Sequence, residues 1–253
     1  MEFVNHRFTL ASRPVGMPKR SDWAYEEETV RDLHEGELLI RVLFISLDPA
    51  MRGWMNQSRS YVPPVGIGEV MRALALGQVV ASRNPLFAVG KHVSGTFGVQ
   101  EYFISEGKGL IEVDLRVAPL PTFLNVLGMT GMTAYFGPLD ICRLQPGETV
   151  LVSGAAGAVG SLVGQVAKIV GSRAVGIAGS DQKVAWLVNE LSFAGGFNHK
   201  TSTNYVARLK QLCPNGVDCY FDNVGGAITG AVFPVRNTKG RISFVGRSLS
   251  AML

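Results

Sequence analysis

The stretch that decides the fold is TVLVSGAAGAVGSLVGQVAKIV, residues 149–170. It opens with an apolar, β-branched run typical of a buried strand and continues with apolar residues at helical spacing. Small residues stand between the two patterns, at Ala155, Gly157 and Gly160. They allow a tight strand-to-helix turn, let the backbone approach a pyrophosphate, and permit close packing of the helix on the strand. An isolated cluster of this kind also fits an ordinary turn, so the neighbouring sequence decides the interpretation.

The sequence after Gly147 continues the alternation of strand and helix. Such alternation is typical of an α/β protein with a Rossmann-type, doubly wound parallel sheet. In this context the glycine cluster predicts a dinucleotide-binding loop. The predicted strands are residues 149–153, 174–178, 196–198, 217–222 and 241–245, and the predicted helices lie near 159–170, 182–191, 203–212 and 227–235.

Residues 1–120 have a different pattern. Short β-like runs such as ELLIRVLFISLDP and LALGQVVAS alternate with glycine and proline, which predicts a β-rich, antiparallel, partly open barrel domain. Residues 121–137 carry apolar and small residues at near-helical spacing, so we expect a helix that enters the second domain. The two predicted domains are therefore residues 1–120 and 121–253.

The composition narrows the class of protein. With 253 residues, 47% of them hydrophobic, the chain can bury a sizeable core. The formal charge of +4 is not gathered in a basic arm, which argues against a nucleic-acid partner. The three cysteines form no CxxC pair, so we expect neither a disulfide framework nor a metal site. No export signal or long apolar segment is visible, which favours a soluble, cytoplasmic protein without a membrane partner.

The end of the second predicted strand bears on the choice of dinucleotide. An acidic residue there would bind the ribose 2′-hydroxyl and repel a 2′-phosphate. The sequence instead reads GIAGSDQK, in which Ser180 and Lys183 can donate to a phosphate while Asp181 serves as the N-cap of the next helix. This pattern predicts a preference for NADPH. The alternative for Lys183 is an ordinary solvated lysine in a first helical turn.

Several motifs together resemble one branch of a known family. The chain is similar to the zinc-independent prostaglandin reductase, 2-alkenal reductase and curcumin reductase group of the medium-chain dehydrogenase/reductase superfamily. The resemblance covers nearly the whole chain and implies a GroES-like first domain before the Rossmann domain. The motifs that carry it are LDPAMRGWM (47–55), SRSYVPPVGIGEVM (58–71), VLGMTGMTAYFGPLDI (126–141), AAGAVGSLVGQVAK (155–168), GIAGSDQK (176–183) and CYFDNVGG (219–226).

The resemblance implies roles for residues along a bound NADPH. Lys183 would bind the 2′-phosphate, and His199 stands where the family usually places a tyrosine beside that phosphate. A surface histidine at a strand end is the alternative for His199. The residues implied along the pyrophosphate are Gly157, Ala158, Val159 and Gly160, and those implied near the nicotinamide are Asn223, Val245, Gly246, Met129, Thr130 and Thr133. For the last three, a methionine-rich core helix is the alternative, and for Gly246 a simple turn.

The implied reaction is reduction of the carbon–carbon double bond of an α,β-unsaturated ketone or aldehyde. Hydride goes to the β-carbon, and the resulting enolate needs a hydrogen-bond donor and then a proton. The family's DPYMR tyrosine is replaced by Ala50, and its second tyrosine is not found in VGRSLSAML at the end of the chain. Tyr61 is the remaining candidate for the catalytic donor. A packing role for Tyr61, or protonation by water or a cofactor hydroxyl, stays open.

Two other functions fit the same residues. One is NADPH-dependent quinone reduction, and the other is a catalytically weak NADPH-binding protein, suggested by Ala50. The resemblance also implies a sixth strand and a returning segment beyond Leu253. If Leu253 is the natural end, we expect an exposed sheet edge, self-association such as a homodimer, and weakened activity.

Overall fold

The computed structural model describes residues 3–58 and 60–246, and the chain divides into two units, Met1–Leu124 and Asn125–Met252. The second unit contains a five-stranded sheet in the order β10-β9-β8-β11-β12. All of its strand pairs are parallel. The chain starts in the centre, moves outward in one direction and then returns to the other side, which is the doubly wound arrangement predicted from the sequence. The strands are β8 (Thr149–Ser153), β9 (Arg173–Ala178), β10 (Gly195–Asn198), β11 (Val217–Asp222) and β12 (Arg236–Phe244).

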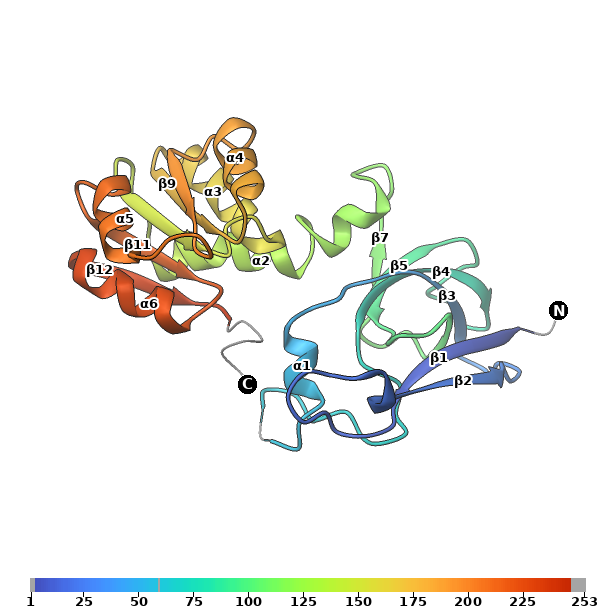
Figure 1. Ribbon diagram of the computed structural model, residues 1–253. Helices are drawn as coiled ribbons and strands as arrows, with labels where there is room; N and C mark the ends of the chain where they lie inside the picture. Colours follow the sequence, from blue (N-terminus) through green and yellow to red (C-terminus); the bar gives the residue numbers. More distant parts are fainter. Residues whose placement is uncertain (1–2, 59, 247–253) are drawn as a thin grey trace. The chain divides into compact units, whose positions relative to one another are not determined.

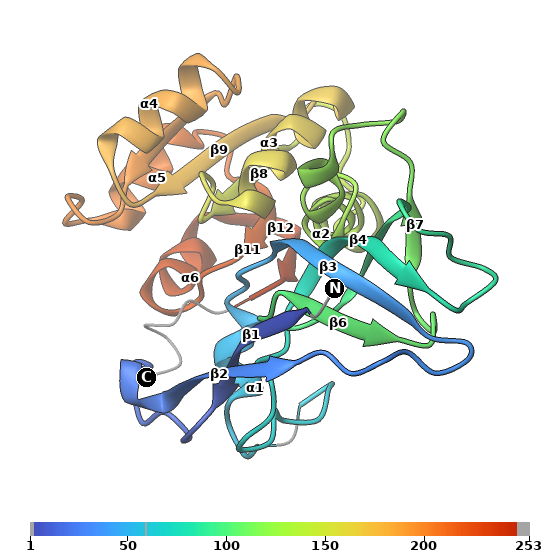
Figure 2. The same cartoon turned by 90° about the vertical axis from the view of Figure 1, so that its right-hand side faces the viewer.

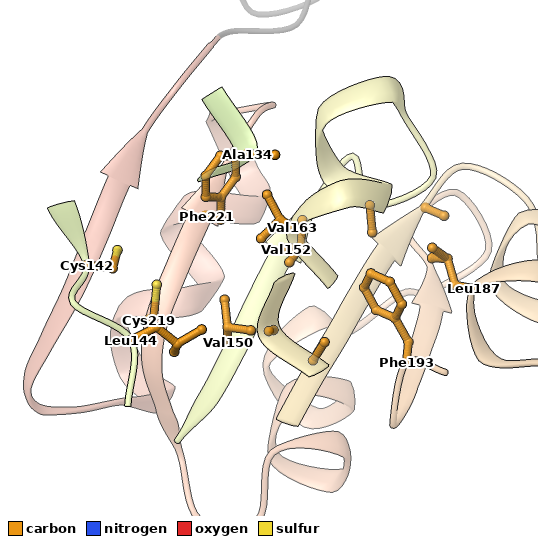
Figure 3. Packing of buried hydrophobic residues seen from close by; sticks show 14 residues of the cluster. Ala134, Cys142, Leu144, Val150, Val152, Val163, Leu187, Phe193, Cys219 and Phe221 are labelled. Atoms are coloured by element: carbon orange, nitrogen blue, oxygen red, sulfur yellow. The ribbon is translucent and has the colours of Figure 1, made fainter. Parts of the chain in front are cut away.

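Helices cover both faces of this sheet (Figure 1). α3 (Ala158–Val170) and α4 (Asp181–Asn189) pack on one face, and α5 (Tyr205–Leu212) and α6 (Gly226–Val232) on the other. Strands β8 and β11 are buried on both sides of the sheet, because their side chains alternate between the core under α3 and α4 and the core under α5 and α6. Figure 3 shows the α3 face, where Val150 and Val152 of β8 lie beside Val163 of α3.

The predicted helix at 121–137 is interrupted in the structure. A short 3₁₀ helix, η2 (Leu120–Leu124), ends the first unit, and α2 (Met129–Phe136) begins only after an extended Gly128. The break is stabilised by Asn125, whose backbone carbonyl accepts hydrogen bonds from the amides of Gly128 and Gly131 at 2.9 and 3.0 Å. The prediction of one continuous helix was therefore wrong. A single π-turn, η3 (Gly137–Ile141), follows α2.

The last strand and the last helix also differ from their predicted bounds. β12 starts at Arg236, five residues before the predicted 241–245, and reaches its main register with β11 after an irregularity. Lys239 within it has a positive φ of 64°, which the apolar pattern did not reveal. α6 ends at Val232, and a 3₁₀ turn, η4 (Phe233–Val235), follows because Pro234 cannot continue the helical hydrogen-bond ladder.

The first unit is β-rich, as predicted. It contains an open antiparallel sheet in the order β6-β3-β4-β5-β7 and a ribbon of β1 paired with β2 (Figure 2). Isolated bridges from Arg7 to Gln100 and from Thr9 to Val70 join the ribbon to neighbouring loops. The strands are β1 (Val4–Leu10), β2 (Trp23–Thr29), β3 (Leu38–Ile45), β4 (Leu74–Ser82), β5 (His92–Thr96), β6 (Tyr102–Ser105) and β7 (Ile111–Val113).

Two apolar clusters stabilise this unit. Leu38 and Ile40 of β3 pack with Val79 of β4 beneath the sheet. Trp54 and Met55, at the end of the short helix α1 (Ala50–Trp54), fill the second cluster. Full burial of one such side chain contributes about 1.5 to 3 kcal/mol, so each cluster is a substantial part of the folding free energy. Among the residues that the structure describes, no helix is both long and apolar enough to cross a membrane.

Candidate functional site

In the glycine loop between β8 and α3, Gly157 and Gly160 have different surroundings. A Cβ atom added to Gly160 would lie 2.5 Å from the carbonyl oxygen of Gly154 and 2.7 Å from the Cα of Ala155. Glycine is thus required at Gly160 by close packing inside the protein. A Cβ atom added to Gly157 would meet only the Gly154 oxygen, at 3.2 Å. Internal packing therefore explains Gly160 but leaves the space in front of Gly157 open.

The amino end of α3 faces that open space with unused donors. The first helical hydrogen bond runs from the amide of Ser161 to the carbonyl of Gly157, at 3.0 Å. Within the described part of the chain, no protein group accepts from the amides of Ala158, Val159 or Gly160. No acidic side chain lies in the first turn either. Free amides and the positive end of the helix dipole together form an environment that favours an anion.

The loop after β9 forms the amino end of α4. Ser180, not Asp181, is the N-cap: its hydroxyl oxygen accepts from the backbone amide of Lys183 at 3.3 Å. The predicted capping role of Asp181 was wrong, because its carboxylate instead accepts from the side-chain amide of Asn198 at 3.1 Å. The hydroxyl proton of Ser180 remains available for donation. The side chain of Lys183 is exposed on the same first turn.

Two residues at the end of β10 lie against this loop. A Cβ atom added to Gly179 would be 3.5 Å from Nε2 of His199 and 3.6 Å from Cε of Lys200. Within residues 3–58 and 60–246, no carboxylate lies within 4.0 Å of the charged atoms of Lys183, His199 or Lys200. Lys200 was not predicted from the sequence. Its position directly after a strand of a parallel sheet was the signal that could have identified it, because such strands end at one edge.

Asp222, at the end of β11, organises the third part of the site and was also not predicted. This carboxylate is fully buried. Its Oδ1 accepts from the hydroxyls of Ser153 and Tyr220, both at 2.9 Å, and its Oδ2 accepts from Thr229 at 2.6 Å. Burial alone would raise the pKa of Asp222, but hydrogen bonds from Thr229, two loop amides and Ser153 lower it below the ordinary value. Asp222 is therefore an ionised organising group.

The loop held by Asp222 positions Asn223. The side-chain amide of Asn223 donates to the carbonyl of Ser153 at 2.8 Å, and its backbone amide donates to the Ser153 hydroxyl at 2.9 Å. The amides of Val245 and Gly246 donate to the Asp222 carbonyl at 2.9 and 3.3 Å. The ends of β8, β11 and β12 thus meet at the neighbouring residues Asp222 and Asn223. The structure brings Asn223, Val245 and Gly246 together, although they come from two strands.

The three residues predicted on the entering segment all lie on α2. Met129 is 62% exposed, so the alternative of a core methionine does not hold for it. The hydroxyl of Thr130 donates to the Asn125 carbonyl at 2.8 Å, and that of Thr133 donates to the Met129 carbonyl at 2.7 Å. Each hydroxyl proton is therefore engaged locally, and each hydroxyl oxygen can still accept a hydrogen bond.

Tyr61 belongs to the first unit. Its ring is 79% exposed, which excludes a buried packing role, and its hydroxyl oxygen accepts from Nε1 of Trp54 at 3.3 Å. The guanidinium of Arg72 lies 5.6 Å from the centre of the Trp54 ring and donates to the Pro63 carbonyl at 2.8 Å. The loop that carries Tyr61 is thereby attached to the core of its unit. The hydroxyl proton of Tyr61 points to no acceptor among the described residues.

Metal chemistry finds no support in the side chains that the structure describes. No group of three histidine, cysteine, aspartate or glutamate side chains is arranged to hold an ion. Cys142, Cys213 and Cys219 are buried in the two cores of the second unit. The described residues therefore do not fit a zinc site.

Comparison with known families covers both units. Residues 6–113 match the family described as the N-terminal domain of oxidoreductase, and residues 158–252 match the family described as zinc-binding dehydrogenase. The name of the second family refers to a metal whose ligands the described residues do not supply.

Individual relatives are similar along almost the whole chain. NADPH-dependent curcumin reductase of Escherichia coli is 41% identical over 96% of this chain and 70% of its own length. Prostaglandin reductase 1 of Mus musculus is 41% identical over 94% of this chain and 71% of its own length. The crystal structure of CurA from Vibrio vulnificus in complex with NADPH superposes with a TM-score of 0.91 at 40% identity, covering 96% of this chain and 72% of CurA. This chain therefore belongs to the medium-chain dehydrogenase/reductase superfamily, in the group of the curcumin, prostaglandin and 2-alkenal reductases.

Proposed function

We propose that this protein is an NADPH-dependent oxidoreductase that reduces the carbon–carbon double bond of α,β-unsaturated ketones and aldehydes. The observation that carries the proposal is the edge of the parallel sheet. The open glycine loop follows β8 there, and the donors Ser180, Lys183, His199 and Lys200 follow the neighbouring strands β9 and β10. The curcumin and prostaglandin reductases, at 41% identity, support the same reaction class.

The glycine loop fits the pyrophosphate of a dinucleotide. The amides of Ala158, Val159 and Gly160 are unpaired donors at the positive end of α3, and the missing side chain at Gly157 leaves room for two phosphate groups to approach. Because these donors belong to the backbone of a packed helix, they need no reorganisation when the anion binds. We infer that this loop contributes affinity that NADPH and NADH share.

The second anion-binding group distinguishes the two dinucleotides. His199 and Lys200 lie beside Gly179, and Ser180 caps α4, whose first turn carries the exposed Lys183. Asp181 accepts a hydrogen bond from Asn198. A ribose 2′-hydroxyl would find no carboxylate acceptor aligned for it there, whereas a 2′-phosphate would find several donors and two lysine charges. This arrangement supports a preference for NADPH. Lys200 extends the set of residues that we assign to the phosphate.

The ends of β8, β11 and β12 are the proposed nicotinamide side. When bound, NADPH would supply the hydride that the β-carbon of the unsaturated carbonyl receives. Asn223 is held rigidly by Ser153, so its side-chain oxygen is available in one orientation. Val245 and Gly246 directly follow β12, whereas Met129, Thr130 and Thr133 lie on α2. We assign these residues to cofactor orientation and to exclusion of water.

The proton donor is the remaining step. Hydride addition leaves an enolate whose oxygen is stabilised by a hydrogen-bond donor before the α-carbon is protonated. Tyr61 suits this role because Trp54 donates to its oxygen and leaves its hydroxyl proton free. A hydrogen bond accepted by a phenol oxygen also strengthens the phenol as a donor. We therefore propose Tyr61 as the donor to the enolate oxygen.

Cofactor binding and cofactor oxidation must be measured together. We expect the protein to bind NADPH more tightly than NADH, and to oxidise NADPH when given enones or enals with loss of their conjugated absorbance. A saturated ketone of the same carbon skeleton is the control and should support no oxidation. Turnover with quinones alone would favour quinone reduction instead. Tight NADPH binding without oxidation by any acceptor would leave a binding protein and refute the proposed reaction.

A further inference from the structure

Two buried cysteines in the second unit belong to the same apolar cluster and take no part in the proposed reduction. We propose that Cys142 and Cys219 are a redox-modification site, in which hydrogen peroxide closes the two thiols into a disulfide. This inference concerns the core of the unit and does not depend on the proposed reductase activity.

The fold brings these two thiols together from distant parts of the chain. Cys142 follows the π-turn η3, and Cys219 lies in the middle of β11. Both side chains are fully buried in the same apolar cluster. Figure 3 shows Cys142 and Cys219 as neighbours, with the sulfur of Cys219 on the side facing Cys142. A contact between two thiols is the geometric precondition for a disulfide.

Arg241 fixes this pair in place. Its Nε donates to the backbone carbonyl of Cys142 at 2.6 Å, and its position on β12 is paired in register with Cys219. Glu148 forms an ion pair with the guanidinium of Arg241. Because Arg241 contacts one cysteine through a hydrogen bond and the other through strand pairing, η3 cannot move away from β11 without breaking several bonds.

The pKa values of the two thiols shift in opposite directions, which indicates which thiol reacts first with the oxidant. The hydrogen bond from Cys219 lowers the pKa of Cys142 against the effect of burial, and the positive charge of Arg241 lowers it further. The same contact and burial raise the pKa of Cys219. Cys142 also lines a pocket of about 590 Å³ with Asp140, Ile141, Arg143, Gln145 and Arg241, while Cys219 does not. Cys142 adjoins this pocket although its side chain is fully buried, so we assign the first reaction with a small oxidant to Cys142.

The proposed chemistry has two balanced steps. The thiolate of Cys142 attacks one oxygen of hydrogen peroxide, the O–O bond breaks, and Cys142 becomes a sulfenic acid. The hydroxide that leaves takes up the proton released by the Cys142 thiol and forms the first water. The Cys219 sulfur then attacks the sulfur of that sulfenic acid, the S–O bond breaks, and a second water carries away the oxygen and the Cys219 proton. The two cysteines lose two electrons in total, and one hydrogen peroxide is reduced to two waters.

Cys213 provides a matched control within the same unit. It is buried like the other two, but it belongs to the opposite core, and burial raises its pKa to about 11. Neither Cys142 nor Cys219 shares its cluster. A thiol with a raised pKa and no thiol neighbour should stay reduced under the same treatment.

The test uses the unmodified 253-residue protein. The folded protein is treated with a small excess of hydrogen peroxide, unreacted thiols are alkylated in denaturant, and the protein is digested without reduction by trypsin and by a protease that cleaves before aspartate. Cleavage before Asp218 separates Cys213 from Cys219, so no substitution is needed to assign the link. We expect the peptide 140–143 joined to the peptide 218–221, alkylated Cys213, and loss of the link on reduction.

Two further samples sharpen the result. In Cys219→Ser, we expect Cys142 to remain as a sulfenic acid that dimedone labels, because the resolving thiol is gone. In protein unfolded by urea before oxidation, the specificity for the 142–219 link should be lost. The proposal is overturned if Cys142 and Cys219 are both recovered alkylated from the folded protein, if the link contains Cys213, or if the 142–219 link forms only after unfolding.

Discussion

The hydroxyl of Ser153 donates to Oδ1 of Asp222 at 2.9 Å and thereby joins the end of β8 to the end of β11. The same hydroxyl oxygen accepts from the backbone amide of Asn223 at 2.9 Å. Two central strands and the loop that carries Asn223 thus share one fully buried hydrogen-bonded group. Because these strands also flank the glycine loop, the position of Asn223 relative to that loop depends on Asp222.

Replacing Asp222 with asparagine should destabilise the second unit. The carboxylate of Asp222 accepts five hydrogen bonds, and an asparagine amide would remove its charge and turn an NH₂ group toward some of these donors. Loss of a hydrogen bond to a charged group costs about 1.5 to 3 kcal/mol. The folded pKa of Asp222 is lowered, so its contribution is fully present above the ordinary value of 3.8 and is lost as pH falls through the folded pKa. Urea unfolding of both proteins at several pH values should show a difference that shrinks below about pH 4. A pH-independent difference would contradict this account.

The two glycines of the loop should respond differently to substitution. Gly157→Val should abolish dinucleotide binding while most of the fold persists, because the added side chain enters the space in front of α3 and meets only one protein atom near its Cβ. Gly160→Ala should lower the melting temperature, because its Cβ would overlap the backbone of Gly154 and Ala155. Calorimetric titration with NADPH and thermal unfolding separate the two effects. Wild-type affinity in Gly157→Val would show that the loop is only a turn.

Lys183, in the first turn of α4, and Lys200, shortly after β10, should discriminate between NADPH and NADH. Lys183→Ala should weaken NADPH binding by about 1.5 to 3 kcal/mol and leave NADH binding nearly unchanged, because only NADPH carries the 2′-phosphate. Lys200→Ala should show the same selective loss, since Cε of Lys200 lies beside Gly179. Lys210→Ala, an exposed lysine on α5, is the matched control. Equal losses for both dinucleotides would refute the assignment of these lysines to the phosphate.

Removal of the Tyr61 hydroxyl should slow the reaction without weakening cofactor binding. For Tyr61→Phe we expect kcat to fall by about 100-fold, the lower range for loss of a positioned proton donor, with the Kd for NADPH unchanged. Tyr25→Phe is the control, because Tyr25 is a 58% exposed tyrosine of the same unit that packs on Phe8. Steady-state rates with one enone suffice. Unchanged kcat in Tyr61→Phe would assign the proton to water or to a cofactor hydroxyl.

Much of the second unit was predictable because its signals are local. The bounds predicted for residues 149–153 and 217–222 are those of β8 and β11, since each run is short, has apolar residues at its centre and is bounded by turn residues. The choice between Ser180 and Asp181 as N-cap was not predictable, because both residue types cap helices well. Asn198, from a different strand, engages Asp181 and leaves the capping position to Ser180.

Residue periodicity and spacing were sufficient for the fold class, and they located the glycine loop and the loop after β9 that carries Ser180. These features depend on neighbours within a few positions of the chain. The tertiary structure alone decided that Lys200 lies beside Gly179, that Ser153 joins Asp222, and that Cys142 and Cys219 share one apolar cluster. Each of these pairs lies far apart in sequence and is brought together by strand order and by packing on a sheet face. Such contacts depend on long-range burial, which no local pattern encodes.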